Sequence, residues 1–422
     1  MYFPSIDMQK NMMLQVARRV VAGFGSSSCI AAAVAVAVVL PAQTLVGQTK
    51  GAAAAPPSQF RRVTQVGIGP TNSITDVPNL KVGMYTRTDS GYRTGTTVIR
   101  TEYGATAGYS QMGGAPGTKE TDLLKPGGEV RTVQAIVLSG GSAYGLDAAT
   151  GVMRWMEEHN YGVPIGTAGV VPIVPAAILM DLGRGGNFKK RPDADFGYKA
   201  AEAATNAPVK SGRVGMGMGA GWGMGTASVK LSNGYTVAAI VGVNPAGSPL
   251  DPRTCLPYGL FLEMDNEFNL VQPSASECKT AVAGRGGPKD GSDHAVTNTT
   301  IAVVATDAPI EDLEAERMAQ VADAGLARSI RPIFGISDGD TVFGLATTAP
   351  THTLTNADLQ GIFQAAADVL GRAVVHAVVD SHQVGSSRVG YCEEYPSACV
   401  KRHAQNTQVP SSSSVGAGAA RQ

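Results

Sequence analysis

The fold of this chain is decided by the stretch Asn298-Thr299-Thr300-Ile301-Ala302-Val303-Val304-Ala305-Thr306-Asp307-Ala308-Pro309. It joins a glycine-rich segment, residues 281–297, to an apolar, β-branched run that is typical of a buried strand. If the peptide bond between Asn298 and Thr299 breaks, Thr299 gains a free amino group beside its own hydroxyl. A nucleophile and a base then stand on one residue. The stretch therefore predicts a hidden N-terminus and a chain that becomes two subunits.

Thr299 carries a side chain that can drive such a cleavage. A hydroxyl at this position can attack the preceding carbonyl through a five-membered ring and form an ester, which water then opens. The freed α-amine has a reference pKa of about 7.7–8.0, so near neutral pH a large fraction is deprotonated and can accept the hydroxyl proton. No histidine is then required. Taken alone, these residues also fit an ordinary strand that starts after a loop.

Further short motifs follow in a fixed order within residues 74–380. They are Ile74-Thr75-Asp76-Val77-Pro78, Thr94-Gly95-Thr96-Thr97-Val98, Gly113-Gly114-Ala115-Pro116-Gly117-Thr118, Leu138-Ser139-Gly140-Gly141-Ser142-Ala143-Tyr144-Gly145-Leu146-Asp147-Ala148-Ala149, Val171-Pro172-Ile173-Val174-Pro175, Val243-Asn244-Pro245-Ala246-Gly247 and Ser337-Asp338-Gly339-Asp340. Together with the Thr299 stretch, they resemble the self-cleaving L-aminopeptidase/D-esterase family, which includes β-peptidyl aminopeptidases and 6-aminohexanoate-oligomer hydrolase. The resemblance implies an α/β fold, a four-layer α/β/β/α sandwich of the N-terminal-nucleophile type, and hydrolysis of amide bonds.

The resemblance also assigns roles to individual residues. The nucleophile of the family stands six positions before the Ala-Thr-Asp-Ala-Pro run, which is Thr299 here. Asn244, at the end of an apolar strand expected at 235–243, would donate its amide N–H to the developing oxyanion; on local sequence it also reads as a turn residue. Tyr144 would supply a second donor or contact the substrate, and a place in the core is equally compatible with its position.

Asp338 and Asp340 flank Gly339 in a predicted tight turn, so both carboxylates can face one site. In the family this pair is Ser and Glu in the aminopeptidases but Asp and Asp in the oligomer hydrolase, and this chain has the second type. A carboxylate can orient the ammonium of Thr299, and two close carboxylates shift each other's titration. Binding of the substrate's amino terminus and a plain turn are the alternatives that the sequence leaves open.

One segment departs from the family. Many relatives carry a lysine in the glycine-rich region before the strand that ends at Asn244, whereas residues 215–225 hold none, and Lys210 and Lys230 only flank them. A lysine-assisted mechanism is therefore in doubt. The segment matches neither a dinucleotide-binding nor a P-loop pattern, and we expect its Met and Trp side chains to lie in the core or to line a pocket.

The composition favours a soluble enzyme. Lys plus Arg and Asp plus Glu both number 34, so the formal net charge is zero and no general attraction to nucleic acid or to an anionic membrane is expected. The partners expected are a small peptide or amide substrate and, by the resemblance, further copies of the cleaved αβ unit in a homotetramer.

The first 48 residues resemble a secretory signal peptide. Arg18 and Arg19 precede an apolar run, residues 29–40, and the small-residue stretch Pro41-Ala42-Gln43 follows. The run is too short to span a bilayer, although an uncleaved anchor is an alternative. We therefore expect a periplasmic or secreted protein with residues 49–298 as the α subunit, 299–403 as the β subunit and 404–422 as a disordered tail, in one intertwined catalytic domain.

Four cysteines remain after the signal peptide, and an even number in an exported protein predicts disulfides. The simplest pairing joins Cys255 to Cys278 and Cys392 to Cys399, although three pairings are possible. Neither spacing is that of a zinc site, and the six histidines form no metal-binding motif. We expect neither a metal nor a cofactor.

The hydrophobic pattern predicts alternating strands and helices. Strands are expected at 133–138, 300–305 and 341–347. Helices are expected at 143–158 with Ser142 as N-cap, from Pro309 onward, and at 356–379 with Thr355 as cap.

Two other functions compete with an amidase. An acyltransferase resembling ornithine acetyltransferase would share the fold and a self-generated threonine, and a non-catalytic secreted binding protein would keep its chain uncut. A serine-hydrolase elbow at Ser142 is excluded, because Tyr144 stands where that motif needs glycine.

Overall fold

The computed structural model describes residues 62–284, 298–385 and 387–402. The predicted signal peptide, residues 1–48, the predicted tail, residues 404–422, and most of the predicted linker before Asn298 lie outside the described residues. The described residues cover most of the part of the chain that is expected to form the catalytic domain.

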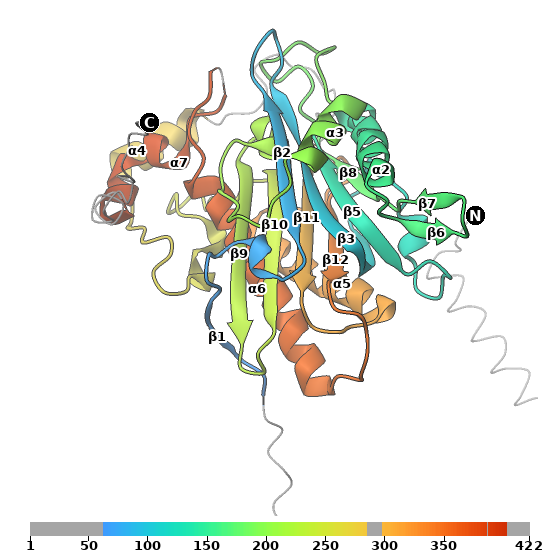
Figure 1. Ribbon diagram of the computed structural model, residues 1–422. Coiled ribbons are helices and arrows are strands. Elements are labelled where there is room, and N and C mark those ends of the chain that lie inside the picture. The colour runs from blue at the N-terminus through green and yellow to red at the C-terminus, as the bar shows by residue number, and fades with distance from the viewer. Residues whose placement is uncertain (1–61, 285–297, 386, 403–422) are drawn as a thin grey trace, which may run out of the picture. The chain divides into compact units, whose positions relative to one another are not determined.

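Ten strands form one mixed sheet that bends so that its two halves face each other (Figure 1). The first half contains β1 (Gln65–Ile68), β9 (Gly223–Leu231), β10 (Thr236–Asn244), β11 (Thr299–Thr306) and β12 (Thr341–Ala346). The second contains β2 (Lys81–Arg87), β3 (Thr94–Gln111), β5 (Thr132–Ser139), β8 (Ala176–Ile178) and β4 (Thr118–Lys119). The long strand β3 joins the halves, because its end pairs with β12 while its start pairs with β2.

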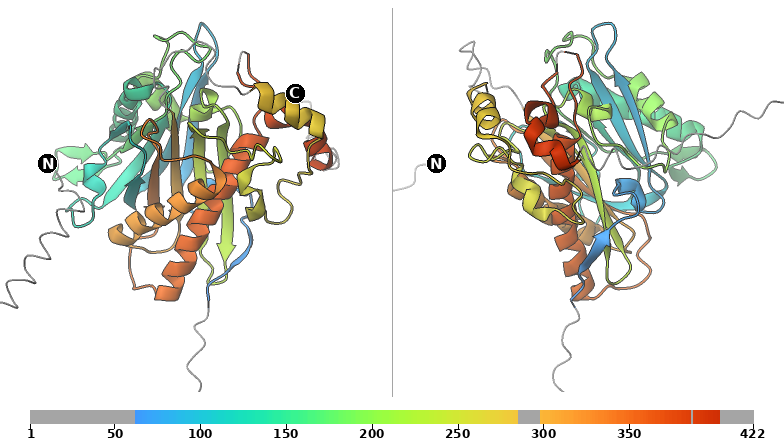
Figure 2. Two further views of the ribbon diagram at one scale, coloured as in Figure 1. Left: turned by 180° about the vertical axis from the view of Figure 1, so that it is seen from behind. Right: turned by 90° about the vertical axis from the view of Figure 1, so that its left-hand side faces the viewer.

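Helices cover the outer face of each half (Figures 1 and 2). Helices α5 (Asp312–Ser329) and α6 (Asn356–Val379) pack on the first half, and α2 (Ala148–Glu158) and α3 (Ala194–Glu202) pack on the second. A third apolar cluster fills the space between the halves with side chains such as Ile99, Ile240 and Phe343. Three cores between four layers confirm the predicted α/β/β/α sandwich.

Alternation along the strands divides the side chains between these cores. On β10, Val241 and Val243 pack against the helices, while Ala238 and Ile240 face the opposite half of the sheet. Successive residues of a strand point to opposite faces, so an apolar residue is needed at every position. This explains why β10 and β11 read as continuous apolar runs.

Most of the expected elements lie close to their predicted bounds. Helix α6 spans exactly the predicted residues 356–379, and the Thr355 hydroxyl accepts a hydrogen bond from the Asp358 backbone N–H at 3.2 Å. Among the described residues, α6 is long and apolar enough to cross a membrane, but 83% of its apolar window is buried in the protein, as is typical of a core helix. Met216, Met218 and Trp222 are buried, which confirms the expected core position.

Two predicted helix starts are wrong. Helix α5 begins at Asp312 rather than Pro309, because Glu311 and Glu314 form a capping box and Pro309 lies in the connection from β11. Ser142 is not the N-cap of α2. Residues Ser142–Asp147 form a 3-10 turn with a positive φ of 52° at Ser142, and the α-helix starts only at Ala148.

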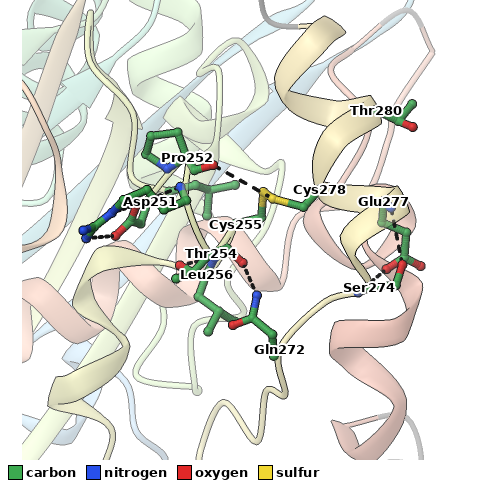
Figure 3. The surroundings of a disulfide bond; sticks show 12 residues. Asp251, Pro252, Thr254, Cys255, Leu256, Gln272, Ser274, Glu277, Cys278 and Thr280 are labelled. Atoms are coloured by element: carbon green, nitrogen blue, oxygen red, sulfur yellow. Dashed lines mark hydrogen bonds and ion pairs between the residues drawn. A yellow bond between two sulfur atoms is a disulfide. The ribbon is translucent and has the colours of Figure 1, made fainter.

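Two disulfides confirm the simplest pairing. Cys255, in the loop after β10, is bonded to Cys278 on α4 (Ala275–Gly284). Close to this disulfide, the Gln272 side chain donates a hydrogen bond to the Thr254 carbonyl (Figure 3). Cys392 on α7 (Tyr391–Glu394) is bonded to Cys399. The remaining elements are the hairpin of β6 (Val163–Ile165) and β7 (Gly169–Val171) and the 3-10 turns Ile74–Asp76, Asp122–Leu124, Gly215–Met218, Tyr258–Leu262 and Pro396–Cys399.

Candidate active site

Strand register brings Asn244 and Thr299 together. β10 and β11 are antiparallel, and Asn244, the last residue of β10, is the partner of Thr299, the first residue of β11. Both residues fall on the same side of their strands as Ile240 and Ile301, which pack between the two sheet halves. Thr299 is 3% exposed and Asn244 is 1% exposed. The nucleophile and the oxyanion donor expected from the sequence therefore lie side by side.

The carbonyl oxygen of Asn298 is held between two donors. The Gly339 backbone N–H donates to it at 3.0 Å, and the Thr299 hydroxyl also donates to it. Asn298 in turn donates its backbone N–H to the Ser337 carbonyl at 3.2 Å. The Thr299 oxygen is thus next to the carbonyl that self-cleavage would attack, and Gly339 is placed where charge on that oxygen would develop.

Backbone N–H groups hold the two aspartates of the Asp338-Gly339-Asp340 turn. Asp340 accepts from Thr300 at 2.6 Å and from Phe334 at 3.0 Å, and Asp338 accepts from Ala246 at 3.0 Å. The Asp340 carboxylate therefore lies beside β11, whereas that of Asp338 lies against the turn that follows Asn244. In the described part of the chain, neither carboxylate is hydrogen-bonded to Thr299 itself.

Both aspartates are 1% exposed. Burial raises the pKa of Asp340 to about 7, and the negative charge of Asp338 adds to this, although the N–H donors oppose it. A carboxyl group that titrates near neutral pH beside Thr299 can exchange a proton or hold a cation there.

Asn244 is fixed by three neighbours. Its Nδ2 donates to the Met180 carbonyl at 3.0 Å, and its Oδ1 accepts from the Gly221 backbone N–H at 3.1 Å and from Arg184. Gly339 and Thr299 donate to the Asn298 carbonyl, and the Asn244 amide donates to Met180 instead. Oxyanion binding by Asn244 therefore stays a prediction about the cleaved enzyme.

Arg184 is a site residue that the sequence analysis missed. Its guanidinium donates to the side-chain oxygens of Asn244 and Asn298, the latter at 2.8 Å. Burial lowers the pKa of Arg184, and the nearby Asp181 charge partly offsets this. The Arg184 guanidinium lies beside Asn244. Lys230, which flanks the glycine-rich segment, does not take this place, because it binds Thr236 at the opposite end of β10. The only sequence signal was an arginine between glycines, in Gly183-Arg184-Gly185.

Asp181 anchors the loop that carries Arg184. It accepts from the Thr94 hydroxyl at 2.6 Å and from the Gly141 backbone N–H at 2.7 Å. Burial raises its pKa to about 6. Asp181 therefore connects the Gly140-Gly141 turn, which belongs to one of the short motifs, to the loop that carries Arg184.

Tyr144 lies outside this network. Its side chain is 53% exposed, and the Arg191 guanidinium lies over its ring at 3.4 Å from the centroid. This excludes the core position that the sequence allowed. Contact with a substrate stays a prediction. Among the described residues, no group of three or more His, Cys, Asp and Glu side chains could hold a metal ion.

Comparison with known proteins places the chain in a family. The model of Peptidase family S58 matches residues 72–389. An uncharacterized aminopeptidase of Mycobacterium leprae is 44% identical over 358 residues, which cover 78% of this chain and 96% of the relative. A 6-aminohexanoate-oligomer endohydrolase of Agromyces sp. is 27% identical over 300 residues, which cover 68% of this chain and 79% of the relative.

Solved structures agree on the fold. A β-aminopeptidase of Burkholderia sp. superposes with a TM-score of 0.56 at 23% identity, and covers 78% of this chain and 94% of its own. The L-aminopeptidase D-Ala-esterase/amidase of Ochrobactrum anthropi, a variant of the Ntn-hydrolase fold, gives 0.57 at 22% identity, with 78% and 93% covered. The family match and the 44% identical relative show that the chain belongs to Peptidase family S58 and is a hydrolase of peptide or amide bonds.

Proposed function

We propose that this protein is a self-processing N-terminal-nucleophile amidase of the aminopeptidase type, and that Thr299 is its nucleophile. The observation that carries the proposal is the hydrogen bond of the Thr299 hydroxyl to the carbonyl of Asn298, with Gly339 donating to the same oxygen. The named activities of the family relatives, aminopeptidase and amide hydrolase, favour the same chemistry.

In self-processing, the Thr299 hydroxyl oxygen attacks the Asn298 carbonyl carbon and its proton passes to the amide nitrogen. The C–N bond breaks as the ester C–O bond forms, and water then hydrolyses the ester. The products are a carboxylate on Asn298 and a free amine on Thr299. Gly339 stabilises the oxyanion during the attack, since its N–H already binds that oxygen.

In substrate hydrolysis, the freed Thr299 amine takes the proton of its own hydroxyl, and the hydroxyl oxygen attacks the substrate carbonyl. The proton passes to the leaving amine, an acyl-enzyme ester remains, and water releases the acid. Asn244 and Gly339 are the oxyanion donors in this scheme. Asp340 orients the Thr299 ammonium, because it is the carboxylate beside the Thr300 N–H.

The proposal extends to the state of the mature protein. The first 48 residues act as an export signal, residues 49–298 form one subunit and the chain from Thr299 forms the other. We further propose a periplasmic or secreted homotetramer of these units. The two disulfides are compatible with an oxidising compartment.

Intact mass spectrometry of purified wild-type protein and of Thr299→Ala tests the processing step. Two fragments in the wild type, the smaller beginning at Thr299, and one uncut chain in the variant are expected. A single chain in both, stable on prolonged incubation, would reject the mechanism and favour a binding protein. Two fragments that transfer their acyl group to an added amine in preference to water would instead indicate an acyltransferase.

A further inference from the structure

A cavity lined by arginines lies next to the candidate active site. It has a volume of about 250 Å³, and four of its lining residues are Arg93, Arg184, Arg213 and Arg388. The others are glycine or alanine, so in the part of the chain that the structure describes no acidic side chain lines it. The arginines come from four segments far apart in sequence, which the fold brings to one place.

The cavity and the catalytic residues share parts. Arg184 lines the cavity and donates to Asn244 and Asn298, and Gly221 lines it and donates its backbone N–H to Asn244. One substrate molecule could therefore place a group in the cavity and its carbonyl beside Thr299.

Two more of the arginines, Arg213 and Arg388, are held in place, and the charge of Arg213 is close to those of Arg93 and Arg388. Arg213 donates to the carbonyl oxygens of Ala220, Gly221, His382 and Arg388, which are neutral partners. Arg388 stacks on Trp222 with 3.7 Å between the guanidinium carbon and the ring centroid, and forms an ion pair with Glu394. Burial lowers the pKa of Arg213 to about 10, and the positive charges of Arg93 and Arg388 contribute to this. The site thus concentrates positive charge in a partly desolvated space.

Such a space discriminates between the two ends of an amide substrate. A substrate ammonium would be repelled, whereas a carboxylate would gain charge-assisted, often bidentate hydrogen bonds from guanidinium groups. Arg184 already binds the side-chain oxygen of Asn298, whose carbonyl is the acyl group passed to Thr299 in self-processing. The acyl side of the substrate is therefore the expected origin of the carboxylate.

We propose that the arginine-lined cavity binds a carboxylate of the substrate, so that the enzyme prefers amides with a negative charge near the cleaved bond. This specificity rests on the proposed function, since it assumes that the substrate carbonyl lies beside Thr299.

The test compares charged substrates with neutral ones of the same shape, on processed wild-type enzyme. Aspartyl 4-nitroanilide against asparaginyl 4-nitroanilide examines the acyl side, and alanyl-alanine against alanyl-alanine amide examines the leaving side. The anionic member of at least one pair is expected to have a kcat/KM at least about tenfold higher. The pair that shows the preference identifies the source of the carboxylate.

Variants connect the preference to the cavity. Arg93→Gln should bring the ratio of the preferred pair toward one through a higher KM for the anionic member, and Arg93→Lys should keep part of the preference because the charge remains. Arg317→Gln is the matched control, since Arg317 lies exposed on α5 and binds Gln320. A preference that survives Arg93→Gln unchanged would overturn the proposal.

A binding measurement separates failure of this inference from failure of the proposed function. Calorimetric titration of the processed enzyme with aspartate and with asparagine requires no turnover. Tighter binding of aspartate without hydrolysis of any amide would support carboxylate binding in the cavity and reject the proposed amidase function. Hydrolysis without discrimination in either substrate pair, together with equal binding of the two amino acids, would reject carboxylate binding in the cavity and leave the proposed amidase function standing.

Discussion

The charge cluster against α6 and the Asp338-Gly339-Asp340 turn both bury acidic groups, but they hold them in opposite ways. Glu267 is bound by two basic side chains, with Arg372 Nε at 2.5 Å and His376 Nε2 at 2.9 Å. Although burial pushes its pKa up, the hydrogen bonds from His376 and Arg372 bring it to about 2. Asp340 instead accepts hydrogen bonds from the backbone N–H groups of Thr300 and Phe334, and burial raises its pKa to about 7.

This difference separates a structural charge from one available for chemistry. With a pKa of about 2, Glu267 is ionised near neutral pH, and its partners tie α6 to the loop at residue 267. Asp340 changes its charge near neutral pH and lies beside the residue that would become the N-terminus. Buried ion pairs are fixed by mutual charge, whereas a carboxylate held by neutral N–H groups remains free to respond to a new ammonium.

The largest expected effect on stability comes from breaking the α6 cluster. In the uncut Thr299→Ala chain, Glu267→Gln should lower the free energy of unfolding by about 3–5 kcal/mol, because it leaves the buried Arg372 guanidinium without a carboxylate partner, while His376 keeps its contact with Asp380. Urea denaturation measures this. Asp122→Asn, which removes an exposed ion pair with Lys125, is the control and should leave the unfolding midpoint unchanged. If both variants unfold at the same urea concentration, the α6 cluster is not structural.

Loss of the amide at Asn244 should act on catalysis instead. Asn244→Ala is expected to lower kcat by about 10²–10³-fold, since a missing oxyanion donor typically costs that much. Steady-state kinetics on processed enzyme measure it. Asn233→Ala, which removes a surface hydrogen bond to Asp358, is the matched control. An unchanged kcat in Asn244→Ala would assign the oxyanion to other donors.

The pH dependence of stability sharpens the comparison further. Because the pKa of Asp340 is raised from 3.8 to about 7 by folding, the folded chain binds more protons than the unfolded chain between these values. The Asp340 contribution is therefore fully present below pH 4 and is lost as the pH rises to about 7. Asp181 and Asp323, both with a pKa raised to about 6, add slopes of the same sign.

Asp340→Asn in the uncut Thr299→Ala chain should therefore flatten the decline between about pH 4 and 7 without removing it. Denaturant titrations at several pH values measure the two slopes. Identical slopes would mean that Asp340 keeps an ordinary pKa in the folded chain.

The smallest effect is expected for Thr299→Ser. The serine keeps the hydroxyl and the future amine and loses one buried methyl group, so processing and hydrolysis should stay within about tenfold of the wild type. Gel analysis of processing over time, followed by kinetics, measures this. Complete loss of processing would mean that packing of the methyl group, rather than the hydroxyl, governs the junction.

Local patterns placed four candidate residues but gave them no role. Strand and turn signals put Thr299 and Asn244 at the ends of apolar strands and Asp338 and Asp340 around a glycine turn, and the roles proposed for them came from the family resemblance. Arg184 could not be found this way, because it reaches Asn244 across 60 residues and Asn298 across 114 residues from a loop without periodicity. The donor role of Gly339 is carried by a backbone N–H, which no side-chain motif reveals.

The fold shows the same division. Continuous apolar runs predicted β10 and β11, and the capped apolar pattern predicted α6 to the residue. The predicted starts of α2 and α5 were wrong for different reasons. Before α2, Gly141 donates its backbone N–H to Asp181 of another segment, which the sequence pattern does not show. At α5 the reason is local, because the capping box of Glu311 and Glu314 sets the start in place of Pro309.

The central claim is that Thr299 carries the acyl group of the substrate. The most direct measurement incubates processed enzyme with an excess of an amino acid ester, quenches it in acid within milliseconds to seconds, and determines the mass of the fragment that begins at Thr299. We expect a mass gain of one aminoacyl group, mapped by fragmentation to Thr299 and removed by hydroxylamine. An acyl group on any other residue, or turnover by the uncut Thr299→Ala chain at the wild-type rate, would contradict the account.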